Sequence, residues 1–264
     1  MKLENIGGIL VLYQCNWQDS ITLQSLNRAA AMASITFKVS IYDNSPNARQ
    51  TTNFTNLDII EVVHNANNPG VSAAYNHFAH KIQEKFAWLL LLDQDTEFPE
   101  NYFEELKSFL PEDIELILPG LYQRDTVISP HAFKNGYSYS IAHPGKGVYS
   151  LNNRSALNSG ILICTSTFLN AGGYAEDVPL YFSDQVFIHK LKYNGLHRYY
   201  LLNARCRHNM ASNDASDGKS FRQRYLMFIS GAKAARPHFG FTTKLGLNAL
   251  VLLRGLKLSL RHKN

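Results

Sequence analysis

Short apolar runs alternate with amphipathic stretches over roughly the first hundred residues. Four of these runs have the length of buried strands: residues 8–13, 36–42, 57–63 and 86–92. Between them, residues 21–33 and 71–85 carry apolar side chains at helical spacing, and Ser20 is a suitable N-cap for the first helix. Strand, helix and strand in so short a space imply right-handed parallel connections. The pattern therefore predicts an α/β domain.

The pattern is less regular in the second half of the chain. We predict helices at residues 99–110, at 166–171 and from Ser183 or Asp184 to Gly195, and strands at 114–119, 157–164 and 198–202. Residues 120–153 are rich in Ser, Tyr, His, Gly and Pro, which is typical of loops and short strands that line a cleft. Some side chains there suit a sugar contact but suit an ordinary surface as well, and no role is assigned to them: His131, Tyr137, Tyr139 and His143.

The last fifty or so residues change character. Residues 221–235 and 243–261 combine Lys and Arg with helical apolar spacing, and leucines recur from Leu245 to Leu260. A helix this charged is unsuited to spanning a bilayer but suits the interface of an anionic membrane. Its leucines would suit equally the surface of the domain or of a second subunit. Residues 213–264 are predicted to form a cationic helical extension, with both interpretations open.

Composition agrees with a folded protein and narrows its partners. With 264 residues and 45% hydrophobic side chains, the chain can bury the core of an α/β domain. The net charge of +5 and the pI near 9.0 favour an anionic partner without choosing between nucleotide, nucleic acid and lipid headgroup. Three distant cysteines indicate neither a disulfide framework nor a zinc site, and they suit a reducing compartment. We expect no export signal and no membrane span, since no apolar stretch reaches about 18 residues.

Two carboxylates follow the most apolar predicted strand. Asp93 and Asp95 come directly after residues 86–92, and in extended chain residues two apart point to the same side. Ligands of open α/β sheets bind beyond the carboxyl ends of strands, so both side chains can face one ion. Carboxylate oxygens suit Mg²⁺ or Mn²⁺, and such an ion implies a substrate with a diphosphate. The alternative is a solvated turn.

Two further polar segments have a functional and an ordinary explanation. Asp43 ends the second predicted strand, where it can accept a hydrogen bond from a nucleoside or shape the turn Asp-Asn-Ser-Pro. Asn68 and Gly70 precede the helix at 71–85, whose N-terminus can attract phosphate or carry an ordinary cap. Their order along the chain is more informative than either segment alone.

Taken in order, these features resemble the nucleotide-binding half of family 2 glycosyltransferases with the GT-A fold, and the resemblance covers residues 8–210. The segment Leu-Leu-Leu-Asp93-Gln-Asp95-Thr is especially similar to the rhamnosyltransferase branch. The resemblance implies a Rossmann-like, mostly parallel sheet with helices on both faces. It also implies a glycosyltransferase domain at 1–212, with a nucleotide-binding half at 1–119 and an acceptor-binding half at 120–212, followed by the extension at 213–264.

The resemblance also implies roles for single residues of the donor site. Asp43 is expected at the nucleotide base, Asp93 near the ribose and the metal, and Asp95 on the metal that bridges the diphosphate. The nucleotide-sugar site further includes residues around the start of the following helix: Asn68, Gly70 and Asn76.

A catalytic carboxylate is implied at Asp184. The family has a general base at the start of a helix, and counting back from Gly195, which ends that helix, gives this position. Many relatives have one acid before the base and another two residues after it, where this chain has Ser183 and Val186. The alternative role for Asp184 is the N-cap of its helix.

A third metal ligand is implied at His208, because many GT-A enzymes have a histidine this far beyond the base. The alternative is a surface loop residue, and the neighbouring Arg205 and Arg207 have the charge to pair with phosphate oxygens. Near the first strand, Gln-Cys at 14–15 replaces the short Tyr-Asn or Thr-Asn turn of the family, and Asn16 is the expected substitute.

The sequence thus predicts an inverting, metal-dependent glycosyltransferase that uses a nucleotide diphosphate sugar, with dTDP-rhamnose suggested by the resemblance. The expected acceptor is a hydroxyl of a cell-surface glycan, such as O-antigen or capsule, or of a lipid-linked intermediate. The expected location is cytoplasmic, peripheral on the inner membrane through the C-terminal helix. The alternatives are a sugar nucleotidyltransferase, which usually has a basic Gly-rich loop absent from residues 14–20, and a non-catalytic basic membrane-surface protein. Nucleic acid is not an expected partner, because no binding motif accompanies the positive charge.

Overall fold

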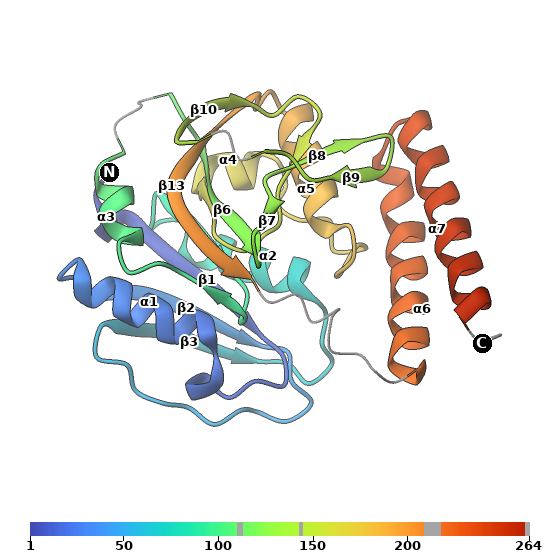
Figure 1. Ribbon diagram of the computed structural model, residues 1–264. Helices are drawn as coiled ribbons and strands as arrows, with labels where there is room; N and C mark the ends of the chain where they lie inside the picture. Colours follow the sequence, from blue (N-terminus) through green and yellow to red (C-terminus); the bar gives the residue numbers. More distant parts are fainter. Residues whose placement is uncertain (110–112, 143–144, 209–217, 262–264) are drawn as a thin grey trace.

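A twisted, mixed β-sheet crosses the centre of the molecule (Figure 1). The computed structural model describes residues 1–109, 113–142, 145–208 and 218–261. The strands of the main sheet are β1 Ile6–Leu12, β2 Phe37–Asp43, β3 Leu57–His64, β4 Trp88–Leu92, β5 Thr96–Glu97, β6 Leu116–Gln123, β7 Thr126–Ser129, β10 Gly147–Ser150, β12 Ile161–Cys164 and β13 Arg198–His208. A smaller sheet has the order β11-β8-β9, with bounds β8 His131–Lys134, β9 Tyr137–Tyr139 and β11 Arg154–Ser155.

Most strands of the main sheet run in one direction. Its order is β10-β13-β6-β12-β4-β1-β2-β3, with β5 paired to β13 and β7 paired to β6. Strands β3, β2, β1 and β4 are parallel, as are β6 and β13, whereas β12 and β10 run against their neighbours. The predicted, mostly parallel α/β sheet is therefore confirmed. The carboxyl ends of β1, β2 and β4 meet at one edge, where Asp43 and Asp93 stand.

Helices cover both faces of this sheet, as predicted. Their bounds are α1 Ile21–Met32, α2 Val71–Ile82, α3 Tyr102–Lys107, α4 Thr165–Asn170 and α5 Ser183–Tyr193, with short 3-10 helices η1 Leu3–Asn5 and η2 Trp17–Asp19. The predicted N-cap is confirmed, because the Ser20 hydroxyl accepts a hydrogen bond from the Leu23 backbone. Helices α1 and α3 share a core with one face of the sheet, and α2, α4 and α5 share a core with the other.

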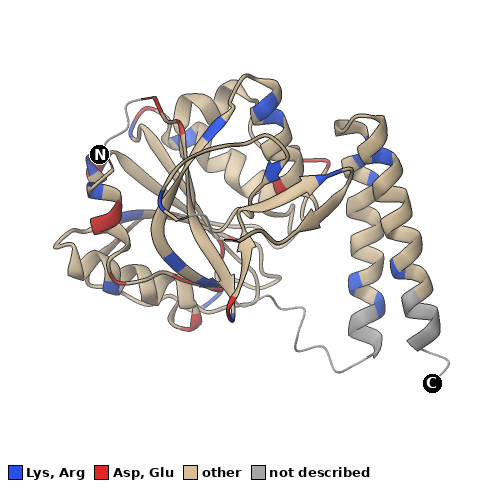
Figure 2. Ribbon diagram, turned by 45° about the horizontal axis from the view of Figure 1, so that its top comes forward, with Lys and Arg blue, Asp and Glu red and all other residues tan. Residues whose placement is uncertain are grey.

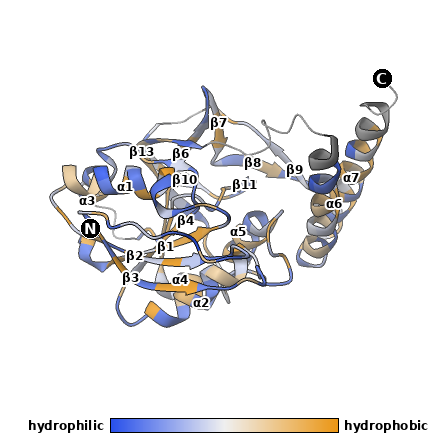
Figure 3. Ribbon diagram, turned by 90° about the horizontal axis from the view of Figure 1, so that it is seen from below, coloured by the Kyte–Doolittle hydropathy of each residue, from blue (hydrophilic) through white to orange (hydrophobic). Residues whose placement is uncertain are grey.

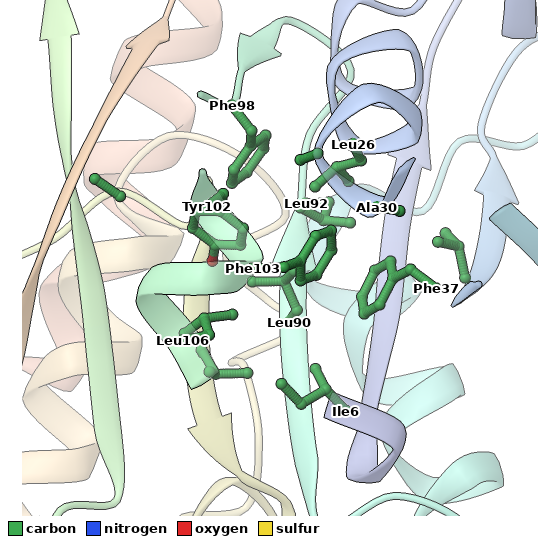
Figure 4. Close-up of a cluster of buried hydrophobic side chains, with 14 of the residues drawn as sticks. Ile6, Leu26, Ala30, Phe37, Leu90, Leu92, Phe98, Tyr102, Phe103 and Leu106 are labelled. Carbon is green, nitrogen blue, oxygen red and sulfur yellow. The ribbon is translucent and has the colours of Figure 1, made fainter. Parts of the chain in front are cut away.

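The central strands are apolar throughout because both of their faces are buried. Leu90 and Leu92 of β4 belong to the core under α1 and α3, while Leu89 and Leu91 belong to the core under α2, α4 and α5. Figure 4 shows the first of these cores. There Phe103 of α3 packs against the sheet, and its ring centroid lies 4.8 Å from that of Phe37 in β2.

Strands β13 and β12 differ clearly from their predicted bounds. Strand β13 continues six residues beyond Leu202. Buried and exposed side chains alternate there, with Ala204 and Cys206 buried and residues 203, 205 and 207 exposed. The arginines in this part of the strand make its sequence polar, which is typical of a loop. The strand predicted over residues 157–164 begins only at Ile161, because the chain turns at Gly160, whose φ is +79°.

The C-terminal extension is a helical hairpin. Helices α6 Gly218–Ala235 and α7 Phe241–Arg261 are joined by the 3-10 helix η4 Arg236–His238 and lie side by side beyond α5 and β9 (Figures 1 and 3). Leu247 of α7 is buried with Val186 of α5 in a small third core, so part of the leucine pattern covers the domain. Leu245, Leu252 and Leu256 remain exposed.

Charge is segregated between the hairpin and the rest of the chain. Ten of the 26 Lys and Arg residues lie in residues 218–264, together with none of the 21 Asp and Glu residues. Figure 2 shows the basic positions of the hairpin. Within the described part of the chain, neither hairpin helix nor any other is long and apolar enough to cross a membrane. The predicted boundary at 212/213, the helix end at Leu110, His143 and the side chain of Leu260 lie outside what the structure describes.

Candidate active site

Asp93 stands at the carboxyl end of β4 and is held by two hydroxyl groups. The Thr96 hydroxyl donates to Oδ1 of Asp93 over 2.6 Å, and the Ser159 hydroxyl donates to Oδ2. Ser159 precedes β12, the antiparallel neighbour of β4, and the backbone N–H of Gly160 donates to the carbonyl of Leu91. The turn before β12 therefore fixes the orientation of the Asp93 carboxylate.

His208 reaches the two aspartates because β13 pairs with β5. That pairing sets His208 opposite Thr96, one residue after Asp95. The His208 Nδ1 atom lies 3.4 Å from Asp93 Oδ2 and 3.7 Å from Asp95 Oδ1, and ligand atoms of all three residues lie within 4.8 Å of one another. The His208 side chain is 12% exposed and ends a strand, so the surface-loop alternative for it is wrong.

The two neighbouring arginines lie on the other face of β13. Successive strand residues alternate in direction, which turns Arg205 and Arg207 away from His208. The Arg205 guanidinium forms an ion pair with Asp125 at 3.2 Å and stacks 4.1 Å from the ring centroid of Tyr122. These contacts argue against pairing of Arg205 with phosphate oxygens in this site, and Arg207 lies 3.9 Å from a carboxylate oxygen of Glu97.

The electrostatics of the cluster favour a bound cation. Burial and the nearby negative charge of Asp93 raise the pKa of Asp95, while His208 lowers it. Two carboxylates this close repel each other unless a positive charge lies between them. Two carboxylate oxygens and one imidazole nitrogen suit a divalent ion such as Mn²⁺ or Mg²⁺, and the residues present therefore fit such an ion.

A cavity of about 790 Å³ opens from the aspartate pair. Tyr13 and Gln14, directly after β1, form one part of its wall, and residues 179 and 180 form another. Among the predicted donor-site residues, Asn68 and Gly70 line it together with Asp93 and Asp95. Asn44 also lines it, and its buried Oδ1 has no hydrogen-bond partner among the described residues. The sequence pattern did not indicate this residue.

Gly70 is required by packing as well as by the cavity. Its φ is +92°, and a Cβ at this position would lie 2.4 Å from the carbonyl oxygen of Pro179. The same carbonyl accepts a hydrogen bond of 3.0 Å from the backbone N–H of Val71, the first residue of α2. One donor of the helix N-terminus is thus used to attach α2 to the segment before α5.

Asp43, Asn76 and Asn16 are not among the described residues that line this cavity. The two oxygens of Asp43 accept hydrogen bonds from the backbone N–H groups of Ser45 and Arg49, at 2.9 and 3.0 Å. These bonds fit the Asp-Asn-Ser-Pro turn, and the expected contact of Asp43 with the nucleotide base stays a prediction. The Asn16 side-chain amide donates to Oδ2 of Asp19 over 3.0 Å. Gln14, rather than Asn16, lines the cavity.

The Asn76 side chain connects α2 to the loop after α4. Its amide donates to the Tyr174 carbonyl over 2.9 Å and to Glu176 over 3.0 Å, and its oxygen accepts from the Tyr174 backbone over 2.8 Å. Every part of this amide is therefore occupied by protein partners. These bonds position the loop after α4 against α2, and the expected role of Asn76 as a nucleotide-sugar ligand stays a prediction.

Asp184 lies in the first turn of α5 with an oxygen free to accept a proton. The N-cap position belongs to Phe182, at φ +71°, so the N-cap alternative for Asp184 is wrong. Its Oδ1 is buried, without a hydrogen-bond partner among the described residues. Burial, followed by the charge of Asp93, raises the pKa of Asp184 to about 7. Val186, at the position of the acid found in relatives, is buried in the third core instead.

Helix α6 contributes a wall of the cavity that the sequence reasoning missed. Gln223, Arg224 and Met227 face the same space as Asp93 and Asp95. Arg224 is the one Lys or Arg among the described residues of this wall, and it has no ion pair with a described carboxylate. The Lys and Arg residues of the segment 222–236 indicated that it binds an anionic partner. Their spacing did not indicate which of these side chains faces the site.

Comparisons with known proteins point to one family. The sequence matches the family described as glycosyl transferase family 2 over residues 21–168. No curated protein sequence matches significantly. The crystal structure of S. aureus TarS 1–349 aligns with 88% of this chain and 68% of its own, at 16% identity and a TM-score of 0.55. Its complex with UDP-GlcNAc aligns with 88% and 70%, at 15% identity and a TM-score of 0.52.

A third solved structure is also similar in fold. GalNAc-T7, crystallised with UDP, GalNAc and Mn²⁺, aligns with 88% of this chain at 12% identity and a TM-score of 0.58. The aligned part is 48% of that protein, about half of its length. At such identities these likenesses establish the fold and leave substrates to be argued from the site.

Proposed function

The chain belongs to glycosyl transferase family 2 and has the GT-A fold, and from this we propose that it is an inverting, metal-dependent glycosyltransferase. It transfers a sugar from a nucleoside diphosphate to a hydroxyl of a surface glycan or a lipid-linked intermediate. The observation that carries the proposal is the buried, unpartnered oxygen of Asp184 within reach of the charge of Asp93. A base so close to a diphosphate-binding cluster suits direct displacement at the sugar.

The donor occupies the cavity beyond β1 and β4. Asp93, Asp95 and His208 would hold a Mg²⁺ or Mn²⁺ ion, which would supply positive charge against the leaving diphosphate. Arg224 faces the same cavity and adds a guanidinium for phosphate oxygens. Among donors, dTDP-rhamnose is the first choice because residues 90–96 resemble rhamnosyltransferases, and uridine diphosphate sugars are the second because TarS is solved with UDP-GlcNAc.

Asp184 performs the proton transfer. It accepts the proton of the acceptor hydroxyl while that oxygen forms a bond to the anomeric carbon of the donor sugar. The bond from the anomeric carbon to the diphosphate breaks, and the nucleoside diphosphate leaves with the electron pair. Attack from the side opposite the leaving group inverts the anomeric configuration. Burial keeps the pKa of Asp184 near 7, which makes it a stronger base than an ordinary aspartate.

The two halves of the domain and the extension share this work. Residues 1–119 bind the nucleotide, residues 120–212 bind the acceptor, and the extension from residue 213 supplies the α6 wall. The exposed leucines and the basic residues of the hairpin bind an anionic membrane, which locates the enzyme at the cytoplasmic face of the inner membrane. This suits synthesis of a surface polysaccharide such as O-antigen or capsule.

The role of Asp184 is tested by an experiment that measures turnover and donor binding separately. Metal-dependent release of nucleoside diphosphate from its sugar is measured for the natural chain and for Asp184→Asn, with donor affinity measured by calorimetry. We expect the variant to lose turnover by at least about a hundredfold, because general-base catalysis contributes that much, and to keep donor affinity within about threefold. Unchanged turnover, or donor binding lost together with turnover, contradicts the role of Asp184.

A further inference from the structure

A second cavity, of about 400 Å³, lies between the start of α5, the β8–β9 hairpin and the C-terminal helices. Phe182 and Gln185 line it from α5, Tyr137 and Tyr139 from β9, and Arg254 from α7. None of these residues lines the donor cavity among the described residues. The second cavity is therefore a separate space that the donor site does not use.

Three separate segments connect this cavity to the catalytic groups. Leu157 lines it, and two residues later Ser159 donates to Asp93. Phe182 and Gln185 line it on either side of Asp184 along the chain. On α6, Phe228 lines the second cavity, while the preceding residue lines the donor cavity. Segments that carry Ser159, Asp184 and Met227 thus also contribute to the wall of the second cavity.

The lining of the second cavity is typical of a carbohydrate site. Aromatic rings, which offer flat apolar faces to a sugar, come from the β8–β9 hairpin, from the start of α5 and from α6: Tyr137, Tyr139, Tyr181, Phe182 and Phe228. Polar groups are few, as in most ligand sites, and include the amide of Gln185. His131 also lines the cavity and is 4% exposed, and neither of its ring nitrogens has a hydrogen-bond partner of good geometry among the described residues.

Arg254 gives the cavity a positive charge. Its guanidinium lies 3.9 Å from the ring centroid of Phe228, and no described carboxylate forms an ion pair with it. The hairpin that carries Arg254 has no acidic residue in its sequence that could neutralise it. A guanidinium held over an aromatic ring without a carboxylate partner suits the oxygens of a phosphate group.

We propose that the second cavity binds the acceptor and that the acceptor is a glycan carrying a phosphate group, which Arg254 binds while the sugar stacks on the aromatic lining. This rests on the proposed glycosyltransferase function and adds the class of its acceptor. In this arrangement the hydroxyl to be glycosylated points along α5 toward Asp184. The phosphate belongs either to a lipid-linked sugar or to a phosphate-containing polymer.

The first experiment measures binding of defined probes to the full chain by ligand-observed NMR. The probes are glucose 1-phosphate, glucose and inorganic phosphate, in the presence of Mg²⁺ and saturating nucleoside diphosphate to fill the donor cavity. We expect glucose 1-phosphate to bind at least tenfold more tightly than glucose. Arg254→Gln should reduce this preference to less than about twofold, whereas Lys244→Gln, a change at a basic residue of α7 outside the cavity, should leave it unchanged.

The same protein variants show which results contradict the proposal and which molecule supplies the phosphate group. Equal binding of the two sugars, or a preference that survives in Arg254→Gln, overturns the proposal. Nucleoside diphosphate binding by each variant shows that the fold and the donor site are intact, so its absence in the natural chain would instead reject the proposed function. A second arm compares a polyprenyl phosphate sugar in neutral vesicles with a soluble glycerol phosphate oligomer, and tighter binding of either supports the proposal and names the source.

Discussion

At the scale of single residues, the surroundings of Asp95 and Asp184 suit the two carboxylates to different roles. Asp95 is held beside Asp93 and His208, where a cation can neutralise the pair. Asp184 is buried with one oxygen free of partners, which leaves it able to accept a proton. The positions of these residues were predictable from the sequence, because each follows a strand or begins a helix in a recognisable order. Asn44 and Gln14 were not, because their part in the cavity depends on turns that follow two different strands.

The raised pKa of Asp184 predicts how turnover depends on pH. A base must be ionised to accept a proton, and burial with the charge of Asp93 raises the pKa of Asp184 to about 7. Turnover should therefore fall as the pH drops below about 7, by up to tenfold for each pH unit. The measurement is nucleoside diphosphate release between pH 5 and 9. Donor affinity over the same range is the control, and a flat profile from pH 5 to 8 with constant affinity would refute this assignment.

At the scale of elements, a contact between the start of α2 and the loop before α5 joins two segments that are far apart in the chain. Gly70, Val71 and Ser72 meet the backbone of residues 178 and 179 there, and the Ser72 hydroxyl donates to the Val178 carbonyl over 2.7 Å. The strands and helices themselves were predictable from their apolar periodicity. Contacts of this kind were not, because they join segments about a hundred residues apart and leave no periodic signal.

Substitution of Gly70 tests that contact. In Gly70→Ala the new methyl group would meet the Pro179 carbonyl at a φ of +92°, which side chains rarely adopt. We expect a loss of at least about 2 kcal/mol in the free energy of unfolding and a weaker affinity for the donor. Gly240→Ala is the matched control, because a Cβ there meets nothing within 4 Å. Equal stability of the two variants would show that the contact is unimportant.

At the scale of the whole molecule, the hairpin of α6 and α7 is part of the site rather than an appendage. It walls the donor cavity through Arg224 and the second cavity through Arg254. Its helices and their charge were predictable from composition and leucine spacing. Their docking on α5 and β9 was not, because the same spacing suits a membrane, a second subunit or the domain itself.

The exposed face of α7 predicts binding to anionic vesicles. Leu245, Leu252 and Leu256 are at least 60% exposed on a helix without acidic residues. The natural chain should sediment with phosphatidylglycerol vesicles, less so at high salt, and replacement of the three leucines by serine should abolish this. The matched control replaces three exposed apolar residues of the domain by serine: Met32, Val62 and Tyr193. Equal sedimentation of both triple variants would reject membrane binding through α7.

The central claim is that Asp93, Asp95 and His208 hold a cation that binds a nucleoside diphosphate, and thermal unfolding tests it most directly. The chain is unfolded with uridine, deoxythymidine and guanosine diphosphates and their sugars, with and without Mn²⁺ or Mg²⁺. At about 100 times its dissociation constant, one nucleotide should stabilise the fold by about 2.7 kcal/mol only when the metal is present. Asp95→Ala should lose this effect, Arg224→Gln should weaken it, and Asp58→Ala and Arg222→Gln should retain it. Stabilisation without metal, or its persistence in Asp95→Ala, would contradict the claim.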